Sequence, residues 1–234
     1  MSYRQYLNPR EQIVETIGRQ IVQGTIGPII DVASLETEFG VSRTLVRDAI
    51  LALSEKNLVD AKPKRGTMVR PRSEWNLLDL QVLQWDVETR NHARQDLTEV
   101  RRVIEPLVAG LAAERRQESD IVALSSALSA MRESIGDAAS AANADVEFHR
   151  AIARASYNDF LVPVQEVILV GLRVRDLSIE GTSQDSALDI HVALAEAIEQ
   201  GSVVDAQHFA EQIVRRAELD ETRAGHGIDR PTDS

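Results

Sequence analysis

Two imidazoles and a carboxylate have the residue types and the spacing that metal chemistry requires. Asp145 and His149 stand four positions apart, so one face of a helix carries both. Phe148 and Ile152 lie on that side too, which turns the polar pair inward, and His191 lies on a second inward stripe. An inward carboxylate and imidazoles can hold one divalent cation. Because a buried histidine is more often simply hydrogen-bonded, a core without metal remains the alternative.

An arginine and a glutamate one turn apart form a second polar group. Arg101 and Glu105 lie on an apolar stripe with Leu97 and Val108. A buried charged pair is costly unless the pair is complete or serves a ligand. The planar guanidinium matches a carboxylate. We therefore expect Arg101 and Glu105, with Arg175 as a further contact, to bind a small organic acid, although a plain buried ion pair is the alternative.

A third group of residues fits the recognition of DNA. On a helix that begins near Arg43, one arc is apolar and seats the helix on a small core. Arg43, Thr44 and Arg47 occupy the opposite arc. A recognition helix has this arrangement, because its N-terminal residues reach base edges and phosphates in the major groove.

A hairpin with a basic tip follows this helix. Residues 39–73 contain eight Lys and Arg against three Asp and Glu, although the whole chain has a net charge of −11. Solvated charges on an ordinary hairpin would not gather in this way, whereas a surface for a polyanion would. We therefore predict a winged helix-turn-helix. Its DNA contacts are expected from Arg43, Thr44, Arg47, Lys62, Lys64, Arg65 and Gly66.

The other elements are predicted to be helical, so the fold class is mainly α. A helix over residues 9–23 with Asn8 as its cap and a short helix over 33–39 precede the recognition helix. Periodicity of 3.6 residues then marks 96–115, 118–134, 143–156, 158–179, 185–200 and 202–221. The expected organisation is a winged helix-turn-helix domain (1–69), a linker (70–84), an all-helical effector-binding and dimerisation domain (85–223) and a disordered tail (224–234).

Composition restricts the class of protein. A length of 234 residues suits one large or two small domains, and the absence of Cys excludes disulfides and thiolate metal sites. The first residues lack the apolar core of a signal peptide, and no apolar run reaches the roughly 18 residues of a membrane span. We expect a soluble cytoplasmic protein with no membrane partner. Residues 1–75 carry a charge of +2 and the remainder −13, so DNA contact is expected from the first part alone.

These motifs resemble one known family. The chain from residue 8 to residue 221 is similar to GntR-type bacterial transcription regulators, in the FadR-like branch with an all-helical (FCD-type) effector-binding domain. The resemblance rests on Phe39-Gly-Val-Ser-Arg43-Thr-Leu-Val-Arg47-Asp-Ala, on Lys64-Arg65-Gly66-Thr67-Met-Val69, on Asp145-x-x-Phe148-His149, on Asn158-x-x-Leu161, and on His191 with Ala197-Ile198.

The resemblance implies a homodimer that binds a palindromic double-stranded DNA operator and senses a small metabolite. It implies that Asp145, His149 and His191 hold one divalent metal, zinc or nickel, which carries the carboxylate of the effector, and that Arg101 faces this site. The segment Trp75-Asn-Leu-Leu-Asp79, with Val82-Leu83-x-Trp85, looks like members that control sugar-acid catabolism, so a hexonate-type acid is the leading effector class.

Two departures from the family pattern bear on these expectations. Family members usually carry a third metal-binding histidine where this chain has Ile213, and His208 lies on the other side of the same helix. Three ligands still suffice for an open site. Between Gly24 and Leu35 the usual family motif Pro-Gly-x-x-Leu-Pro-x-Glu is missing, so we expect DNA contact to rely more on the recognition helix and the wing.

The sequence thus predicts a DNA-binding regulator, a repressor of a catabolic operon under the control of a small carboxylate, and not an enzyme. The alternative is a metal-dependent enzyme in which Asp145, His149 and His191 hold a metal that activates water. That alternative leaves the attached winged helix unexplained. A DNA-architectural protein without an effector would leave the inward polar residues unexplained.

Overall fold

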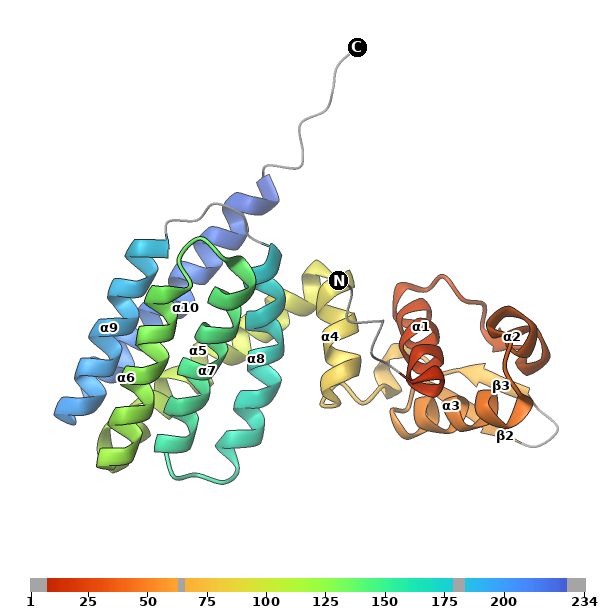
Figure 1. Cartoon of the computed structure of the whole chain (residues 1–234), viewed down its shortest axis with the longest axis horizontal. Helices are drawn as coiled ribbons and strands as arrows, with labels where there is room; N and C mark the ends of the chain where they lie inside the picture. Colours follow the sequence, from red (N-terminus) through yellow and green to blue (C-terminus); the bar gives the residue numbers. More distant parts are fainter. Residues whose placement is uncertain (1–7, 63–65, 179–183, 227–234) are drawn as a thin grey trace, which may run out of the picture. The chain divides into compact units, whose positions relative to one another are not determined.

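A computed structural model shows two compact units, which divide between Arg90 and Asn91 (Figure 1). The structure describes residues 8–62, 66–178 and 184–226. The sequence predicts a linker over 70–84 and the second domain from 85. In the structure, residues 85–90 instead group with the first unit, because a helix in this region packs against the first helix of the chain.

The first unit contains a helix-turn-helix. Its helices are α1 (Pro9–Gln23), α2 (Val32–Phe39) and α3 (Arg43–Glu55). Asn8, Asp31 and Ser42 cap them, because each side-chain oxygen accepts a backbone N–H of the first turn. Gly40 ends α2 with φ of 63°, a left-handed conformation that favours glycine, and so makes the tight turn into α3. The predicted helix bounds agree with these to within one residue.

A three-stranded antiparallel sheet completes the wing. Its strands are β1 (Ile29–Ile30), β2 (Val59–Lys62) and β3 (Gly66–Val69), in the order β1-β3-β2. The hairpin of β2 and β3 is the predicted one. The short strand β1 is not predicted by the sequence analysis, and it pairs Ile29 with Met68 and Ile30 with Thr67. The segment that departs from the family text therefore supplies an edge strand of the wing.

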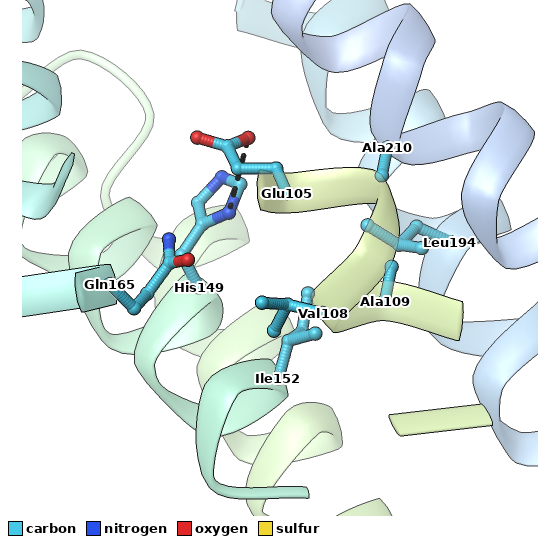
Figure 2. Close-up of a pocket in the computed structure, with 8 residues that line it drawn as sticks. All are labelled: Glu105, Val108, Ala109, His149, Ile152, Gln165, Leu194 and Ala210. Carbon is cyan, nitrogen blue, oxygen red and sulfur yellow. Dashed lines mark ion pairs between the residues drawn. The ribbon is translucent and has the colours of Figure 1, made fainter. Parts of the chain in front are cut away.

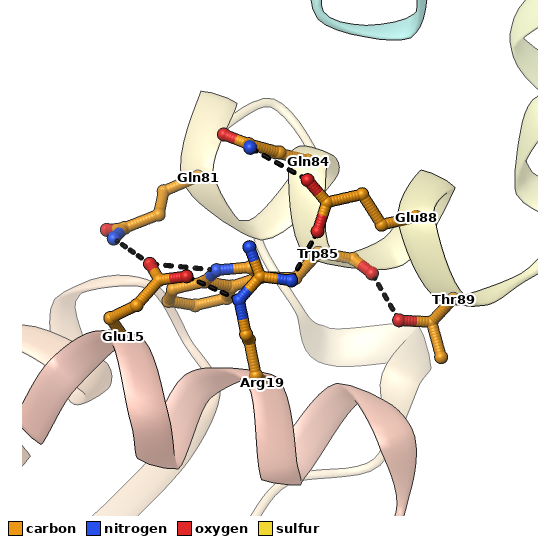
Figure 3. A network of polar contacts seen from close by, with 7 residues as sticks. All are labelled: Glu15, Arg19, Gln81, Gln84, Trp85, Glu88 and Thr89. Atoms are coloured by element: carbon orange, nitrogen blue, oxygen red, sulfur yellow. Dashed lines mark hydrogen bonds and ion pairs between the residues drawn. The ribbon is translucent and has the colours of Figure 1, made fainter. Parts of the chain in front are cut away.

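The segment after the wing is folded. Within it, α4 (Leu80–Thr89) lies against α1, and the Trp85 side chain is buried between them. The Trp85 indole N–H donates to Glu15 Oε2 at 3.1 Å. Arg19 pairs with both Glu15 and Glu88, so a chain of charges joins the two helices (Figure 3).

A buried carboxylate holds the two ends of this segment. Asp86 is 1% exposed and accepts from Arg72 Nη2 at 2.7 Å, in the short 3₁₀ helix η2 (Arg72–Glu74), while Arg90 Nε lies 3.3 Å away. The Trp75 indole N–H donates to the carbonyl of Arg70 at 2.9 Å. These contacts explain why the residues that the sequence predicts to be a linker adopt a fixed structure.

The second unit is a bundle of helices (Figure 1). They are α5 (Asn91–Arg115), α6 (Glu118–Glu133), α7 (Ala138–Ala155), α8 (Leu161–Ser178), α9 (Gln184–Gln200) and α10 (Val203–His226). The helix α7 begins five residues before the predicted start, because Asp137 caps it and alanines continue the helix. The helix α10 extends to His226, within the range expected to be a tail. No described helix is long and apolar enough to cross a membrane.

Candidate DNA-binding surface and effector site

The first turns of α3 present the predicted residues to solvent. Arg43, Thr44 and Arg47 are exposed, whereas Val46 on the opposite arc is fully buried in the core of the unit. The Arg43 Nε atom lies 3.6 Å from Glu36 Oε1 on α2. The structure therefore supports a polar outer face on α3, with an acidic neighbour that the sequence analysis does not single out.

The wing carries the other predicted residues. Lys62 is exposed at the end of β2, and its ammonium lies 2.8 Å from a carboxylate oxygen of Asp60. Gly66 opens β3 with φ of 80°, a backbone conformation that favours glycine. Lys64 and Arg65 lie outside the described residues.

The predicted metal ligands come together in the second unit. Asp145 and His149 of α7 and His191 of α9 are buried, and one ligand atom from each lies within 4.8 Å of the others. The Nε2 atom of His191 is 3.0 Å from Asp145 Oδ1, and the Nε2 atom of His149 is 3.8 Å from the same oxygen. The Phe148 ring packs edge-on against both imidazoles. One carboxylate and two imidazoles in this arrangement suit a divalent metal.

Glu105 joins the predicted anion-binding pair to these residues. Arg101 Nε donates to Glu105 Oε1 at 2.7 Å, and both side chains are 3% exposed. The other carboxylate oxygen, Oε2, lies 3.9 Å from His149 Nδ1. Arg101 Nη2 and Glu105 Oε2 are buried without a hydrogen-bond partner. Because a buried unsatisfied polar group costs roughly 1–3 kcal/mol, this arrangement favours a bound polar group from outside the chain.

Burial favours the uncharged form of His149. Burial lowers the pKa of the His149 imidazole below 6.5, and the carboxylates of Glu105 and Asp145 oppose that effect without overcoming it. The neutral imidazole is the form that binds a metal. The donor set and its protonation therefore fit a metal ion.

A small cavity lies beside Glu105 and His149 (Figure 2). The cavity is small, with a volume of about 10 Å³, which is roughly the space that one water molecule needs. Figure 2 shows Glu105, His149 and Gln165 on one side of the cavity. The apolar and small residues around it are Val108, Ala109, Ile152, Leu194 and Ala210.

Gln165 of α8 is a residue that the sequence analysis missed. Its side chain is buried, and its Oε1 atom has no hydrogen-bond partner. A signal was present, because Gln165 interrupts an inward apolar stripe that includes Leu161, Ile168 and Leu172. A polar residue at the centre of such a stripe is a candidate for a cavity wall.

The remaining predictions about this site have mixed outcomes. Ile213 is 5% exposed and belongs to the apolar cluster of the bundle, as its stripe predicts. His208 is exposed and contacts Gln212, so it does not replace the missing histidine. The Arg175 side chain lies outside the part of the chain whose side chains the structure describes.

The two units match two family models. Residues 9–69 match bacterial regulatory proteins of the gntR family, and residues 96–216 match the FCD domain. A winged helix-turn-helix joined to this helical domain defines the class as a DNA-binding transcriptional regulator. The chain belongs to the GntR family, in the branch that carries an FCD domain.

Relatives of this chain are regulators rather than enzymes. The galactonate operon transcriptional repressor of Escherichia coli (strain K12) is 38% identical over 160 residues, which cover 66% of this chain and 70% of the relative. The HTH-type transcriptional regulator YieP of the same strain is 30% identical over 80% of this chain and 84% of its own length. Among solved structures, Lar of Listeria monocytogenes has a TM-score of 0.68 at 15% identity, with 93% of this chain and 98% of that chain covered, which supports the fold.

Proposed function

We propose that this chain represses an operon for the catabolism of a sugar acid, and that a small carboxylate bound in the second unit controls its binding to the operator. The observation that carries the proposal is the buried series Arg101–Glu105–His149: Arg101 Nη2 and Glu105 Oε2 lack hydrogen-bond partners, and Glu105 and His149 line a cavity. Its relatives include the galactonate repressor and the Uxu operon regulator of Haemophilus influenzae, whose names support the sugar-acid class.

In this proposal the operator is palindromic and the protein binds it as a homodimer. Arg43, Thr44 and Arg47 enter the major groove, since they occupy the exposed arc of α3. The wing contacts adjacent phosphates or the minor groove through Lys62, Lys64, Arg65 and Gly66.

The effector is held by charge. Arg101 offers the planar fork for its carboxylate, while Glu105 fixes the orientation of that guanidinium through the 2.7 Å hydrogen bond. Arg175 supplies a second cationic contact in this proposal.

A divalent cation, zinc or nickel, completes the site in the same proposal. Asp145, His149 and His191 would hold it, because their ligand atoms already converge and His149 is kept neutral. A bound cation would add positive charge beside Arg101 and strengthen the attraction for an acid. With Ile213 in place of a histidine, the chain offers three ligands from these positions.

Thermal denaturation with six-carbon aldonates, each with and without zinc or nickel, tests this proposal. A ligand that binds only the folded state raises the midpoint. The same acids should change the affinity for an operator fragment in fluorescence anisotropy. Arg101→Ala removes the fork and should abolish the acid-dependent shift, whereas Arg132→Ala changes an arginine of α6 outside the cavity and should preserve it. An acid response that survives Arg101→Ala would place the effector elsewhere.

A further inference from the structure

Gln165 is a buried amide whose acceptor oxygen lacks a partner. The side chain is 2% exposed, and Oε1 makes no hydrogen bond. The great majority of buried polar side chains in proteins are hydrogen-bonded, so an unsatisfied one requires an explanation. Leu161, Ile168 and Leu172 on the same inward stripe of α8 provide no hydrogen-bond donor.

A second unsatisfied acceptor faces the same cavity. Glu105 Oε2 is buried without a hydrogen-bond partner, and Glu105, His149 and Gln165 share one side of the cavity (Figure 2). The facing wall includes Val108 and Leu194, which cannot donate either. Two acceptors in one cavity, beside the Nε2 atom of His149 that also lacks a hydrogen-bond partner, match a molecule with O–H groups, which both donate and accept hydrogen bonds.

A structural role for this amide is disfavoured by its energetics. Replacing a buried polar group that lacks a partner by an apolar group of similar shape is neutral or stabilising. A chain that needed only to pack α8 would therefore fold at least as well with an apolar residue at position 165. Groups that reduce the stability of the free protein in this way are typical of binding sites.

We infer that Gln165 is a specificity-determining residue that accepts a hydrogen bond from a hydroxyl group of the effector. The inference rests on the proposed function, because it takes this cavity as the effector site. The ligand class is then a hydroxylated carboxylic acid. Gln165 and Glu105, which line the cavity, accept hydrogen bonds from its hydroxyl groups, and Arg101, which Glu105 holds and which does not itself line the cavity, binds the carboxylate as in the proposed function. An acid without hydroxyls would leave both acceptors unsatisfied and would be rejected.

The experiment is a calorimetric cycle. Wild type and Gln165→Met, a change that keeps the length of the side chain but removes its amide, are titrated with galactonate and with galactonates that lack one hydroxyl each. In wild type, removal of the hydroxyl that donates to Gln165 should weaken binding by roughly tenfold, which corresponds to the loss of one neutral hydrogen bond. In Gln165→Met the parent and that deoxy acid should bind equally, because the partner is gone.

Two further variants control this cycle. Gln95→Met makes the same change at an exposed position of α5 and should keep the tenfold discrimination. Gln165→Glu keeps an acceptor and should keep discrimination too, although the added negative charge weakens acid binding overall. The ligand-free Gln165→Met protein should have a thermal midpoint at or above that of wild type, which also shows that it is folded.

The outcomes separate the inference from the proposed function. Discrimination that persists at every hydroxyl in Gln165→Met, with galactonate still bound by wild type, would overturn the role of Gln165 and leave the effector site intact. A ligand-free Gln165→Met protein that is clearly less stable than wild type would also overturn it, since the amide would then be structural. If wild type bound no hexonate of a panel of stereoisomers, both the proposed function and the inference would fall.

Discussion

At the scale of single residues, the second unit contains charged groups that compensate one another in pairs. Glu105 neutralises Arg101 through a short hydrogen bond, and its second oxygen faces His149. Removal of one partner of a buried pair is more damaging than removal of both, because the other charge remains without compensation. The contribution of this site to the free energy of unfolding is therefore best measured by replacing both partners of a pair together.

The ligand set yields a prediction for metal affinity. Ile213→His should strengthen the binding of zinc or nickel, because it adds a histidine at the position where the family resemblance implies one, and His149→Ala should weaken it by removing a ligand. Isothermal calorimetry measures both effects. The control is His208→Ala, an exposed histidine of the same helix, which should not change the affinity. Equal affinity in Ile213→His and wild type would show that position 213 does not face the metal.

Burial of His149 yields a prediction for the pH dependence of stability. The pKa of His149 is lowered in the folded state, so below pH 6.5 the unfolded chain binds a proton that the folded protein does not. The free energy of unfolding should therefore fall as the pH decreases from 6.5, by at most about 1.4 kcal/mol per pH unit for this group. Urea denaturation in the presence of a chelator at pH 5.5, 6.5 and 7.5 measures it. His149→Asn should reduce the slope, and His208→Asn should retain it.

The exposed arc of α3 yields a prediction for DNA affinity. Arg43→Ala or Arg47→Ala should each cost roughly 1–3 kcal/mol of operator binding if the residue reads a base. Lys62→Ala on the wing should weaken binding by a similar factor on specific and nonspecific DNA and should reduce its salt dependence. Anisotropy titrations at several salt concentrations distinguish the two effects. Arginine variants that bind a mapped operator like wild type would contradict this placement of α3.

At the scale of elements, local signals predicted the helices well and the joining segments poorly. The helix α1 begins and ends where Asn8 and Gly24 indicate, because a capping side chain and a left-handed glycine act locally. The strand β1 is two residues long, so no alternation marks it, and it exists only because β3 offers a free edge. The order in residues 70–90 depends on Trp85 reaching Glu15, a contact between distant parts of the chain.

In the site, too, local spacing was predictive, whereas contacts between helices were not. The one-turn spacing of Asp145 and His149 and of Arg101 and Glu105 predicted which side chains would share a face. That Glu105 would reach His149 could not be predicted, since it depends on how α5 packs against α7. Gln165 carried a local signal, because it interrupts an inward apolar stripe, but the lack of a partner for its Oε1 atom depends on how α8 packs in the bundle.

The packing of α4 on α1 yields a prediction at this scale. A Cβ atom at Gly18 would lie 2.2 Å from ring atoms of the buried Trp85, so Gly18→Ala must displace α4 and should destabilise the first unit by roughly 1–3 kcal/mol. Both tryptophans of the chain lie in this unit, so tryptophan emission during urea denaturation reports on it selectively.

The matched control is Gly27→Ala. A Cβ atom there would meet nothing within 4 Å, so this variant should be as stable as wild type or slightly more stable. If Gly18→Ala denatured at the same urea concentration as Gly27→Ala, α4 would not be packed on α1 in solution.

At the scale of the whole molecule, charge separates the two tasks of the chain. The first 75 residues carry +2, whereas the remainder carries −13. A phosphate backbone attracts the first part and repels the second, which leaves the acidic helices free for ligand and partner.

A homodimer is the prediction at this scale. Light scattering should give a mass of about twice 25.9 kDa for the free protein, and the complex should contain one dimer per palindromic operator. Half-sites separated by about one turn of DNA should bind best, and an insertion of half a turn should weaken binding strongly, because the two recognition helices would then face different sides of the duplex. A monomer in both states would refute this.

The small cavity beside Glu105 also has a consequence for the speed of the response. Because it has room for about one water molecule, helices of the bundle would have to separate before the six-carbon acid of the proposed function could enter it. The observed association rate should then level off at high ligand concentration, at the rate of this opening. The apparent affinity is also reduced by the fraction of molecules that are closed. Collective helix motions of this kind take microseconds to milliseconds in proteins, so under the proposed function this opening would limit the rate of binding in a rapid-mixing experiment and not the response of a cell over seconds.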